Sequence, residues 1–294
     1  MGEMASQLQR LEKIYPQCIP DISKSSTVYC FSDYSGDIKS DKYNTYSFLL
    51  TDDSSIILFS KEHKIIRQKY GIEKRKFSYK DLSDNVLRNA HNDFLTLANG
   101  VNGILLSVAI NKKLHLDFKY DNRSEDFLFL NVQKPKNVQR ILTISHLAAL
   151  FLAGILHHNQ NIMWITDNDN IIANDKFTIQ LTNIAASLIS TLVDFNLGHF
   201  RCGSSRCDCG DNLIEDFLSI PDFAAGTLSN QLGTQISDEY VFWMQRGDAK
   251  EKQNKLSLWL ASSRTPLRKY IFILDPGSVS EKVKTSFFHF YDRQ

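Results

Sequence analysis

The chain has 294 residues, 43% of them hydrophobic and 23% charged, a composition that is typical of a globular protein and excludes a disordered or fibrous one. Its formal net charge is +1, so no overall basic field favours nucleic acid, and binding of that kind would need a local patch. Five cysteines are too few for a disulfide framework, and their odd number suits a reducing compartment, so we expect a cytoplasmic protein.

The N-terminal region predicts neither a secretion signal nor a membrane anchor. Residues 5–14 have the pattern of a short amphipathic helix that ends before Pro16, without the apolar core of a signal peptide. The most apolar run of the chain, Leu147 to Leu156, is about half as long as a helix that crosses a bilayer. We therefore expect this run to be a buried helix and the protein to have no membrane partner.

Three apolar segments near the start of the chain predict an antiparallel meander. The first is TVYCFSD, from Thr27 to Asp33, and the second is YNTYSFLL, from Tyr43 to Leu50. The third is SIILFS, from Ser55 to Ser60, and the polar residues TDDS before it have the composition of a hairpin turn. Each of the three segments is expected to be a strand.

Helices and strands alternate after residue 78, which predicts right-handed crossovers and a mixed sheet that includes parallel strands. The expected helices are 78–100, 138–158, 175–193, 213–232 and one near 252–263, and the expected strands are 103–111, 161–167 and 269–275. The fold class is therefore α/β, with a mixed sheet flanked by helices. We expect an N-terminal extension over 1–26, one domain over 27–236, and a C-terminal helix–strand extension over 237–294 packed on that domain.

Two strands are expected to end in an aspartate, Asp33 and Asp167, and a third aspartate, Asp222, lies in an otherwise apolar helix. The carboxyl ends of parallel strands line one crevice, so these side chains are expected to meet there. Clustered carboxylates repel one another unless a cation joins them, and Mg²⁺ or Mn²⁺ prefers such oxygen ligands. The sequence leaves open that Asp33 only forms a turn, that Asp222 faces solvent, and that Asp169 serves in place of Asp167.

Three motifs carry a resemblance to a known superfamily. FSDYSGD, around Asp33, resembles the Y-x-D-E-S-G-D opening of an uncharacterised bacterial family within the ribonuclease H-like superfamily. IPDFAAG, around Asp222, resembles the late A-D-hydrophobic-x-A-G helix of that family, and ITDND resembles its middle strand, which ends in an aspartate. The resemblance covers roughly residues 27–232.

The resemblance implies a ribonuclease H-like fold over 27–236 and a metal-dependent nuclease that hydrolyses phosphodiester bonds of DNA or RNA. Asp33, Asp167 and Asp222 would be catalytic and would hold Mg²⁺ or Mn²⁺, with Asp169 as a further candidate ligand. The family also carries an acidic residue near the start of its first long helix. Glu73 is the nearest match here, so it is expected to complete the site.

Two departures from the family's pattern favour a second interpretation. Tyr34 stands where the family has a glutamate after the first aspartate, and Asn111 stands where many ribonuclease H-like nucleases carry a carboxylate. The alternative is therefore a catalytically degenerate domain of the same fold that binds nucleic acid or a partner protein. The glycine-rich motifs of phosphate-binding loops do not occur, which argues against an ordinary nucleotide-binding enzyme.

Two further segments have ambiguous patterns. HFRCGSSRCDC, residues 199–209, contains four potential zinc ligands, but their spacing fits no standard zinc site, so we expect a loop without zinc. EKRKFSYK, residues 73–80, places Phe77 and Tyr79 among basic residues. That pattern suits single-stranded nucleic acid and, equally, the solvated start of a helix.

Four polar residues near helix ends are expected to be structural. Glu215 and Asp216 lie about two helical turns before Asp222, and we expect both to face solvent. His157 and His158 follow the apolar helix 138–158 and are expected to cap its C-terminal end, where positive side chains interact favourably with the helix dipole.

Overall fold

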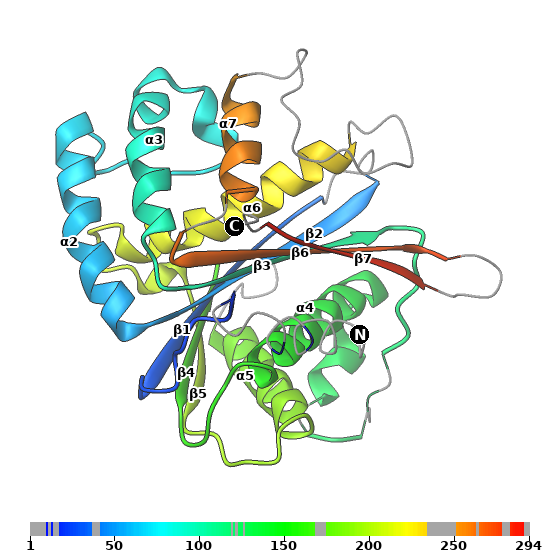
Figure 1. Ribbon diagram of the computed structural model, residues 1–294. Coiled ribbons are helices and arrows are strands. Elements are labelled where there is room, and N and C mark those ends of the chain that lie inside the picture. Colours follow the sequence, from blue (N-terminus) through cyan, green and yellow to red (C-terminus); the bar gives the residue numbers. More distant parts are fainter. Residues whose placement is uncertain are drawn as a thin grey trace.

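The computed structural model describes residues 10, 13, 18–36, 42–118, 120, 123–125, 127–167, 175–233, 251–262, 265–277 and 283–290. These residues form a seven-stranded mixed sheet with helices on both faces, and the strand order is β5-β4-β1-β2-β3-β6-β7 (Figure 1). The strands are β1 (Thr27–Ser35), β2 (Tyr43–Asp52), β3 (Gly103–Asn111), β4 (Asn161–Thr166), β5 (Phe200–Ser204), β6 (Leu267–Pro276) and β7 (Val283–His289). The α-helices are α2 (Asp53–Tyr70), α3 (Asn85–Asn99), α4 (Pro135–Ala153), α5 (Asp175–Ser190), α6 (Leu213–Gly233) and α7 (Glu251–Leu260).

The pairing of the strands gives an antiparallel meander followed by parallel additions. β1 pairs with β2 and β2 with β3 in antiparallel register, whereas β4 is parallel to β1 and β5 is parallel to β4. On the other side of the meander, β6 is parallel to β3, and β7 is antiparallel to β6. The predicted fold class is confirmed: the protein is an α/β protein with a mixed sheet, in an arrangement consistent with the ribonuclease H-like one.

The third strand of the meander is β3, so the prediction of a strand at Ser55–Ser60 is wrong. This segment belongs to α2, because Asp52 caps that helix: its Oδ1 accepts a hydrogen bond from the Ser55 N–H at 2.8 Å. The helix ends at Gly71, whose φ of 64° lies in the left-handed region. Ile57 and Leu58 are 57% and 64% exposed, so a local apolar run here does not mark burial.

Two hydrophobic cores lie on the two faces of the sheet. α4 and α5 cover one face, and α2, α3, α6 and α7 cover the other (Figure 1). Alternate residues of a strand enter different cores, so Cys30 of β1 packs on the α4 side and Phe31 on the α6 side. β3 is buried along its whole length, as its uninterrupted apolar sequence predicts. The helix α6 contacts β1, β2 and β3 on its face of the sheet.

Most other elements lie where the sequence places them, with shifted ends. α3 begins later than predicted because Asp84, rather than Ser78, caps it by accepting from the Val86 N–H at 2.9 Å. α4 ends at Ala153, so His157 and His158 lie beyond the helix and do not cap it. The strands β5 and β7 were not predicted, and the expected helix over 5–14 falls almost entirely outside the described residues.

Within the described part of the chain, no helix is long and apolar enough to span a membrane.

A buried histidine in α3 predicts how stability depends on pH. His91 is 1% exposed, and burial, followed by the charge of Lys255, lowers its pKa from 6.5 to about 4. In the unfolded chain, this histidine binds a proton below pH 6.5, whereas in the folded chain it does so only below about pH 4. The free energy of unfolding therefore decreases across this window as the pH decreases. His91→Leu is expected to remove this pH-dependent loss of stability, which reaches about 3 kcal/mol once the pH is below about 4.

The measurement is a series of urea unfolding curves for wild type and His91→Leu between neutral pH and about pH 4. The difference between the two free energies of unfolding isolates the histidine, because carboxylates such as Asp84 and Asp93 titrate in both proteins. A difference that stays constant over the whole range would contradict the prediction.

Candidate functional site

Carboxylates gather at one edge of the sheet because β1, β3, β4 and β6 all run in the same direction. Their carboxyl ends share that edge, and each of three strands places an aspartate there: Asp33 in β1, Asp167 directly after β4, and Asp275 in β6. The edge is the usual location of ligand sites in sheets of this kind. The structure thus confirms that Asp33 and Asp167 lie at the same end of neighbouring strands.

Asp33 lies inside a strand and does not belong to a turn. β1 continues through Ser35, and Asp33 pairs with Ser47 of β2. Its side chain is on the face of Phe31, whose ring stacks on Phe217 of α6 with centroids 4.7 Å apart. The Asp33 Oδ1 accepts a hydrogen bond from the N–H of the next residue, Tyr34, at 2.8 Å.

Asp222 approaches the same place from α6, directly after Pro221, which lies inside that helix. Its Oδ2 accepts a hydrogen bond from the backbone N–H of Tyr79 at 2.7 Å. One turn further along, the buried hydroxyl of Thr45 in β2 donates to the carbonyl of Ala225 at 3.0 Å. These two bonds hold α6 against the loop before α3 and against the sheet, so the position of Asp222 is fixed by tertiary contacts.

Asp33 and Asp222 form a coupled pair of carboxyl groups. Burial and the neighbouring Asp222 raise the pKa of Asp33 well above its ordinary value, and a hydrogen bond from Asp33 to Asp222 adds to the effect. Burial also raises the pKa of Asp222, against the opposing effects of the Tyr79 N–H and the hydrogen bond from Asp33. One proton shared between the two groups therefore relieves their repulsion, and a divalent cation would relieve it in the same way.

Asp167 lies close enough to affect this pair. Its negative charge contributes to the raised pKa of both Asp33 and Asp222. The Asp167 side chain is exposed, and its Oδ1 accepts a hydrogen bond from the hydroxyl of Ser205, which follows β5, at 3.1 Å. The three aspartates predicted from the sequence are thus brought into one electrostatic cluster, with Asp33 and Asp222 in direct contact and Asp167 at the exposed rim.

The donor set suits a hard divalent cation, but it provides few protein ligands. Among the described residues, no group of three or more His, Cys, Asp or Glu side chains is placed to hold a metal ion. The Asp33–Asp222 pair offers carboxylate oxygens alone, which is the chemistry that Mg²⁺ and Mn²⁺ prefer. Mg²⁺ is commonly bound through only one or two carboxylates and keeps several waters, so the pair fits such an ion.

The other predicted ligands do not join the pair in the described part of the structure. Glu73 is exposed, and its backbone carbonyl accepts a hydrogen bond from Asn212 at 2.6 Å, just before α6 begins. Asn212 precedes Asp222 by ten residues, which is about 15 Å along a helix. Glu73 therefore lies near the N-terminal end of α6, whereas Asp222 lies near the middle of that helix. Asp169 lies outside the described residues.

The two departures from the family pattern have different consequences. Tyr34 lies on the opposite face of β1 from Asp33, and its hydroxyl hydrogen-bonds to Ser32 at 2.8 Å. The identity of residue 34 therefore does not change which carboxyl groups form the Asp33–Asp222 pair. Asn111 is buried, and its Nδ2 donates to Asp275 Oδ1 at 2.8 Å, which gives it a structural partner in β6.

Tyr79 and Gly226 support the pair but were not singled out as site residues. Tyr79 supplies the N–H that binds Asp222, and its half-buried ring lies against Gly226 of α6. A Cβ on Gly226 would lie 2.4 Å from the nearest ring carbon of Tyr79, which is why this position in IPDFAAG requires glycine. Burial raises the pKa of Tyr79 to about 12, with a further contribution from Asp222. A glycine inside an expected helix was the available signal of such a close approach.

Gly226→Ala is expected to lower the free energy of unfolding by about 1–3 kcal/mol, the usual cost of overpacking. An added Cβ would push against the Tyr79 ring, and a shift of this residue is expected to weaken the hydrogen bond from its N–H to Asp222 as well. Gly233→Ala, in the same helix, is the control, because nothing lies within 4 Å of an added Cβ there. Urea unfolding of both variants tests the prediction, and equal stability would contradict it.

The basic segment 73–80 does not present free aromatic rings to nucleic acid. Phe77 is 3% exposed and stacks on Phe94 of α3 with centroids 4.4 Å apart. Arg75 forms an ion pair with Asp84, and Lys76 forms one with Glu215. The interpretation of this segment as a stacking surface is therefore wrong for Phe77, because the ring belongs to the core.

The cysteine-containing segment is partly a strand. Residues 200–204 form β5 at one edge of the sheet, and Ser205–Cys207 form a short 3₁₀ turn after it, so the prediction of a loop is wrong for its first half. Cys202 is partly buried, whereas Cys207 and Cys209 are exposed.

A scan of the sequence against protein-family models found no match, and a search of curated proteins found none either.

Proposed function

We propose that the protein is a metal-dependent nuclease of the ribonuclease H-like superfamily, which hydrolyses phosphodiester bonds of DNA or RNA. The observation that carries the proposal is the contact between Asp33 and Asp222, two partly buried carboxyl groups that come from distant parts of the chain. Their pKa values are raised, which is typical of functional sites. The sheet order and the position of the pair at the carboxyl edge support the same assignment.

The residues of the pair have distinct parts in this proposal. Asp33 and Asp222 would hold Mg²⁺ or Mn²⁺, and the Tyr79 N–H would orient the Asp222 carboxylate. Asp167 lies at the exposed rim, where its carboxylate would contact water molecules around the ion. When bound, the ion would polarise a phosphodiester oxygen and lower the pKa of a water molecule. Lys80, whose charge opposes the raised pKa of Asp222, is a cation beside the pair that would attract a phosphate.

The second candidate function is a catalytically degenerate domain of the same fold that binds nucleic acid or a partner protein. The observation that favours it is the absence, among the described residues, of a third metal-binding side chain in contact with the pair. Such a domain would retain the fold and the coupled carboxyls without cleaving a substrate.

A cleavage assay separates the two candidates. Labelled single-stranded and double-stranded DNA and RNA are incubated with the protein in EDTA, in Mg²⁺ and in Mn²⁺. The nuclease proposal expects cleavage only with a metal, and no cleavage by Asp222→Asn. Binding without cleavage under every metal condition would support the degenerate domain.

A further inference from the structure

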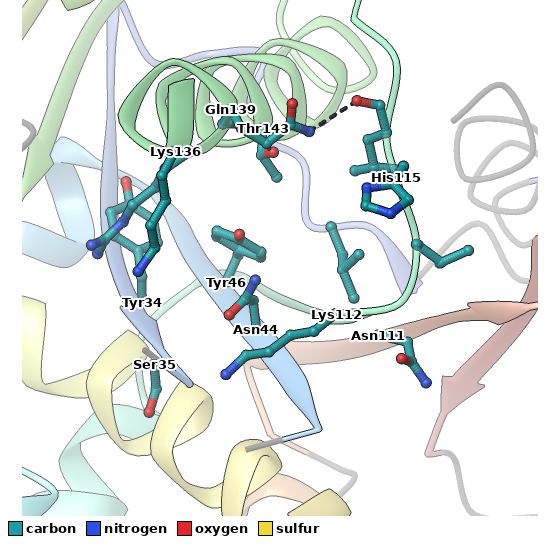
Figure 2. Close-up of a pocket in the computed structure, with 14 residues that line it drawn as sticks. Tyr34, Ser35, Asn44, Tyr46, Asn111, Lys112, His115, Lys136, Gln139 and Thr143 are labelled. Carbon is teal, nitrogen blue, oxygen red and sulfur yellow. Dashed lines mark hydrogen bonds between the residues drawn. The ribbon is translucent and has the colours of Figure 1, made fainter. Parts of the chain in front are cut away.

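A cavity of about 590 Å³ lies between α4 and the ends of β1, β2 and β3 (Figure 2). Tyr34 and Tyr46 contribute to it from the sheet, and both rings belong to the α4 side of the sheet rather than the α6 side. The cavity is therefore on the opposite face from the Asp33–Asp222 pair. Its size is within the range of small-molecule sites in proteins.

The charged residues that line the cavity are all basic. Lys112 follows β3, and Lys136 and Arg140 lie in the first two turns of α4. Lys136 and Arg140 are four residues apart, so they share one face of that helix. Figure 2 shows Lys136 and Lys112 extending into the cavity from α4 and from the end of β3, with Asn44 and Tyr46 between them. Among its described lining residues, the cavity has no aspartate or glutamate.

The start of α4 is an unfavourable place for the cation of Lys136. The first turn of a helix carries a partial positive charge, which favours acidic side chains over basic ones. The first turn of α4 contains no acidic residue, and Lys136 lies within it. An anion in the cavity would relieve this repulsion by contacting both Lys136 and the N-terminal end of the helix.

The cavity lies at the same edge of the sheet as the carboxyl pair. Ser35 lines the cavity, and it is two residues beyond Asp33 on β1, about 7 Å along the strand. Asn111, at the end of β3, also lines the cavity. A flexible ligand that contacts Asp33 could therefore pass over the end of β1 and place a second group between Lys112 and Lys136.

We propose that this cavity binds a phosphate group, with Lys112, Lys136 and Arg140 as its ligands. The phosphate could come from the strand of a nucleic acid whose neighbouring part lies at the carboxyl pair, or from a free mononucleotide. The first source rests on the proposed nuclease function, whereas the second does not. Arginine and lysine contact phosphate oxygens through charge-assisted hydrogen bonds.

Binding is measured by fluorescence anisotropy, with labelled single-stranded DNA and RNA oligonucleotides, and by calorimetry with a 5′-mononucleotide. All proteins carry Asp33→Asn and are kept in EDTA, so that cleavage cannot interfere. The test variants are Lys136→Ala and Arg140→Ala. Lys113→Ala and Lys61→Ala are matched controls, because both lysines are exposed and neither lines the cavity. Lys136 is itself exposed, so its variant is expected to fold.

Each test variant is expected to weaken binding about tenfold. The slope of log affinity against log salt concentration is expected to fall by about one, as for the loss of one phosphate contact. The controls are expected to bind like the parent protein. Loss confined to the oligonucleotides identifies a strand as the source, and loss confined to the mononucleotide identifies the free nucleotide. The proposal is overturned if neither probe binds, or if test and control variants bind equally. Failure of the nuclease function is a separate result, namely no metal-dependent cleavage by the wild type.

Discussion

Replacing Asp216 by alanine is expected to lower the free energy of unfolding by about 3–5 kcal/mol, the usual cost of removing one partner of a buried ion pair. Asp216 lies in the first turn of α6 and is 0% exposed. Its carboxylate accepts hydrogen bonds from Arg67 Nε at 2.7 Å and from Arg67 Nη2, and it contacts His63 Nδ1 at 3.0 Å. Alanine would leave the buried guanidinium of Arg67 without its counter-charge.

The measurement for Asp216→Ala is urea unfolding, with Glu215→Ala as the matched control. Glu215 is the preceding residue in α6. Its side chain is 14% exposed, but its partner Lys76 is 60% exposed, so water screens this pair and the loss of Glu215 is expected to cost less than the loss of Asp216. Equal losses in the two variants would show that the buried pair contributes no more than a partly exposed one. A double variant, Arg67→Met with Asp216→Leu, is expected to recover much of the loss, because it buries no unpaired charge.

Asp33→Asn is expected to abolish metal-dependent cleavage and to remove most of the stabilisation of the protein by Mg²⁺ or Mn²⁺. A ligand that binds only the folded state stabilises it by about 2.7 kcal/mol at a hundred times its dissociation constant. In EDTA the variant is expected to be as stable as the wild type. The reason is that the asparagine amide can donate to Asp222 in place of the shared proton, so the pair keeps a single negative charge and its hydrogen bond.

Thermal melts of wild type and Asp33→Asn, in EDTA and in millimolar metal, measure this effect. Asp93→Asn is the control for a lost carboxylate, because Asp93 pairs with Lys69 at the surface. The metal-site interpretation would be wrong if both proteins responded equally to metal and the variant were less stable in EDTA. That outcome would make Asp33 a structural hydrogen-bond acceptor.

The candidate site was predictable where the signal is local in sequence. An aspartate after a short apolar segment marks the carboxyl end of a strand, and this identified Asp33 and Asp167. An isolated carboxylate in an apolar helix identified Asp222. The contact between Asp33 and Asp222 joins residues that are far apart in the chain, and the supporting bond from Tyr79 comes from a loop without regular structure. No local pattern encodes such contacts.

Two errors show how tertiary packing overrides a local pattern. Asp216 has the composition of a solvent-facing helix start, yet it is fully buried because Arg67 and His63 reach it from α2. Phe77 lies among basic residues, yet it packs into the core against α3. In both cases the partner lies on another element, so the sequence near the residue gives no indication of its burial.

The sequence by itself determined the α/β class, the buried strand β3, the helices α4, α5 and α6, and the identity of the acidic residues, because periodicity, capping and apolar runs are local properties. Only the tertiary structure decided that 55–60 is helical, that 200–204 joins the sheet as β5, and that the basic cavity and the carboxyl pair lie on opposite faces of one edge. These outcomes depend on which strands pair and which helix covers each face. Pairing and coverage are set by the summed burial and hydrogen bonding of distant segments.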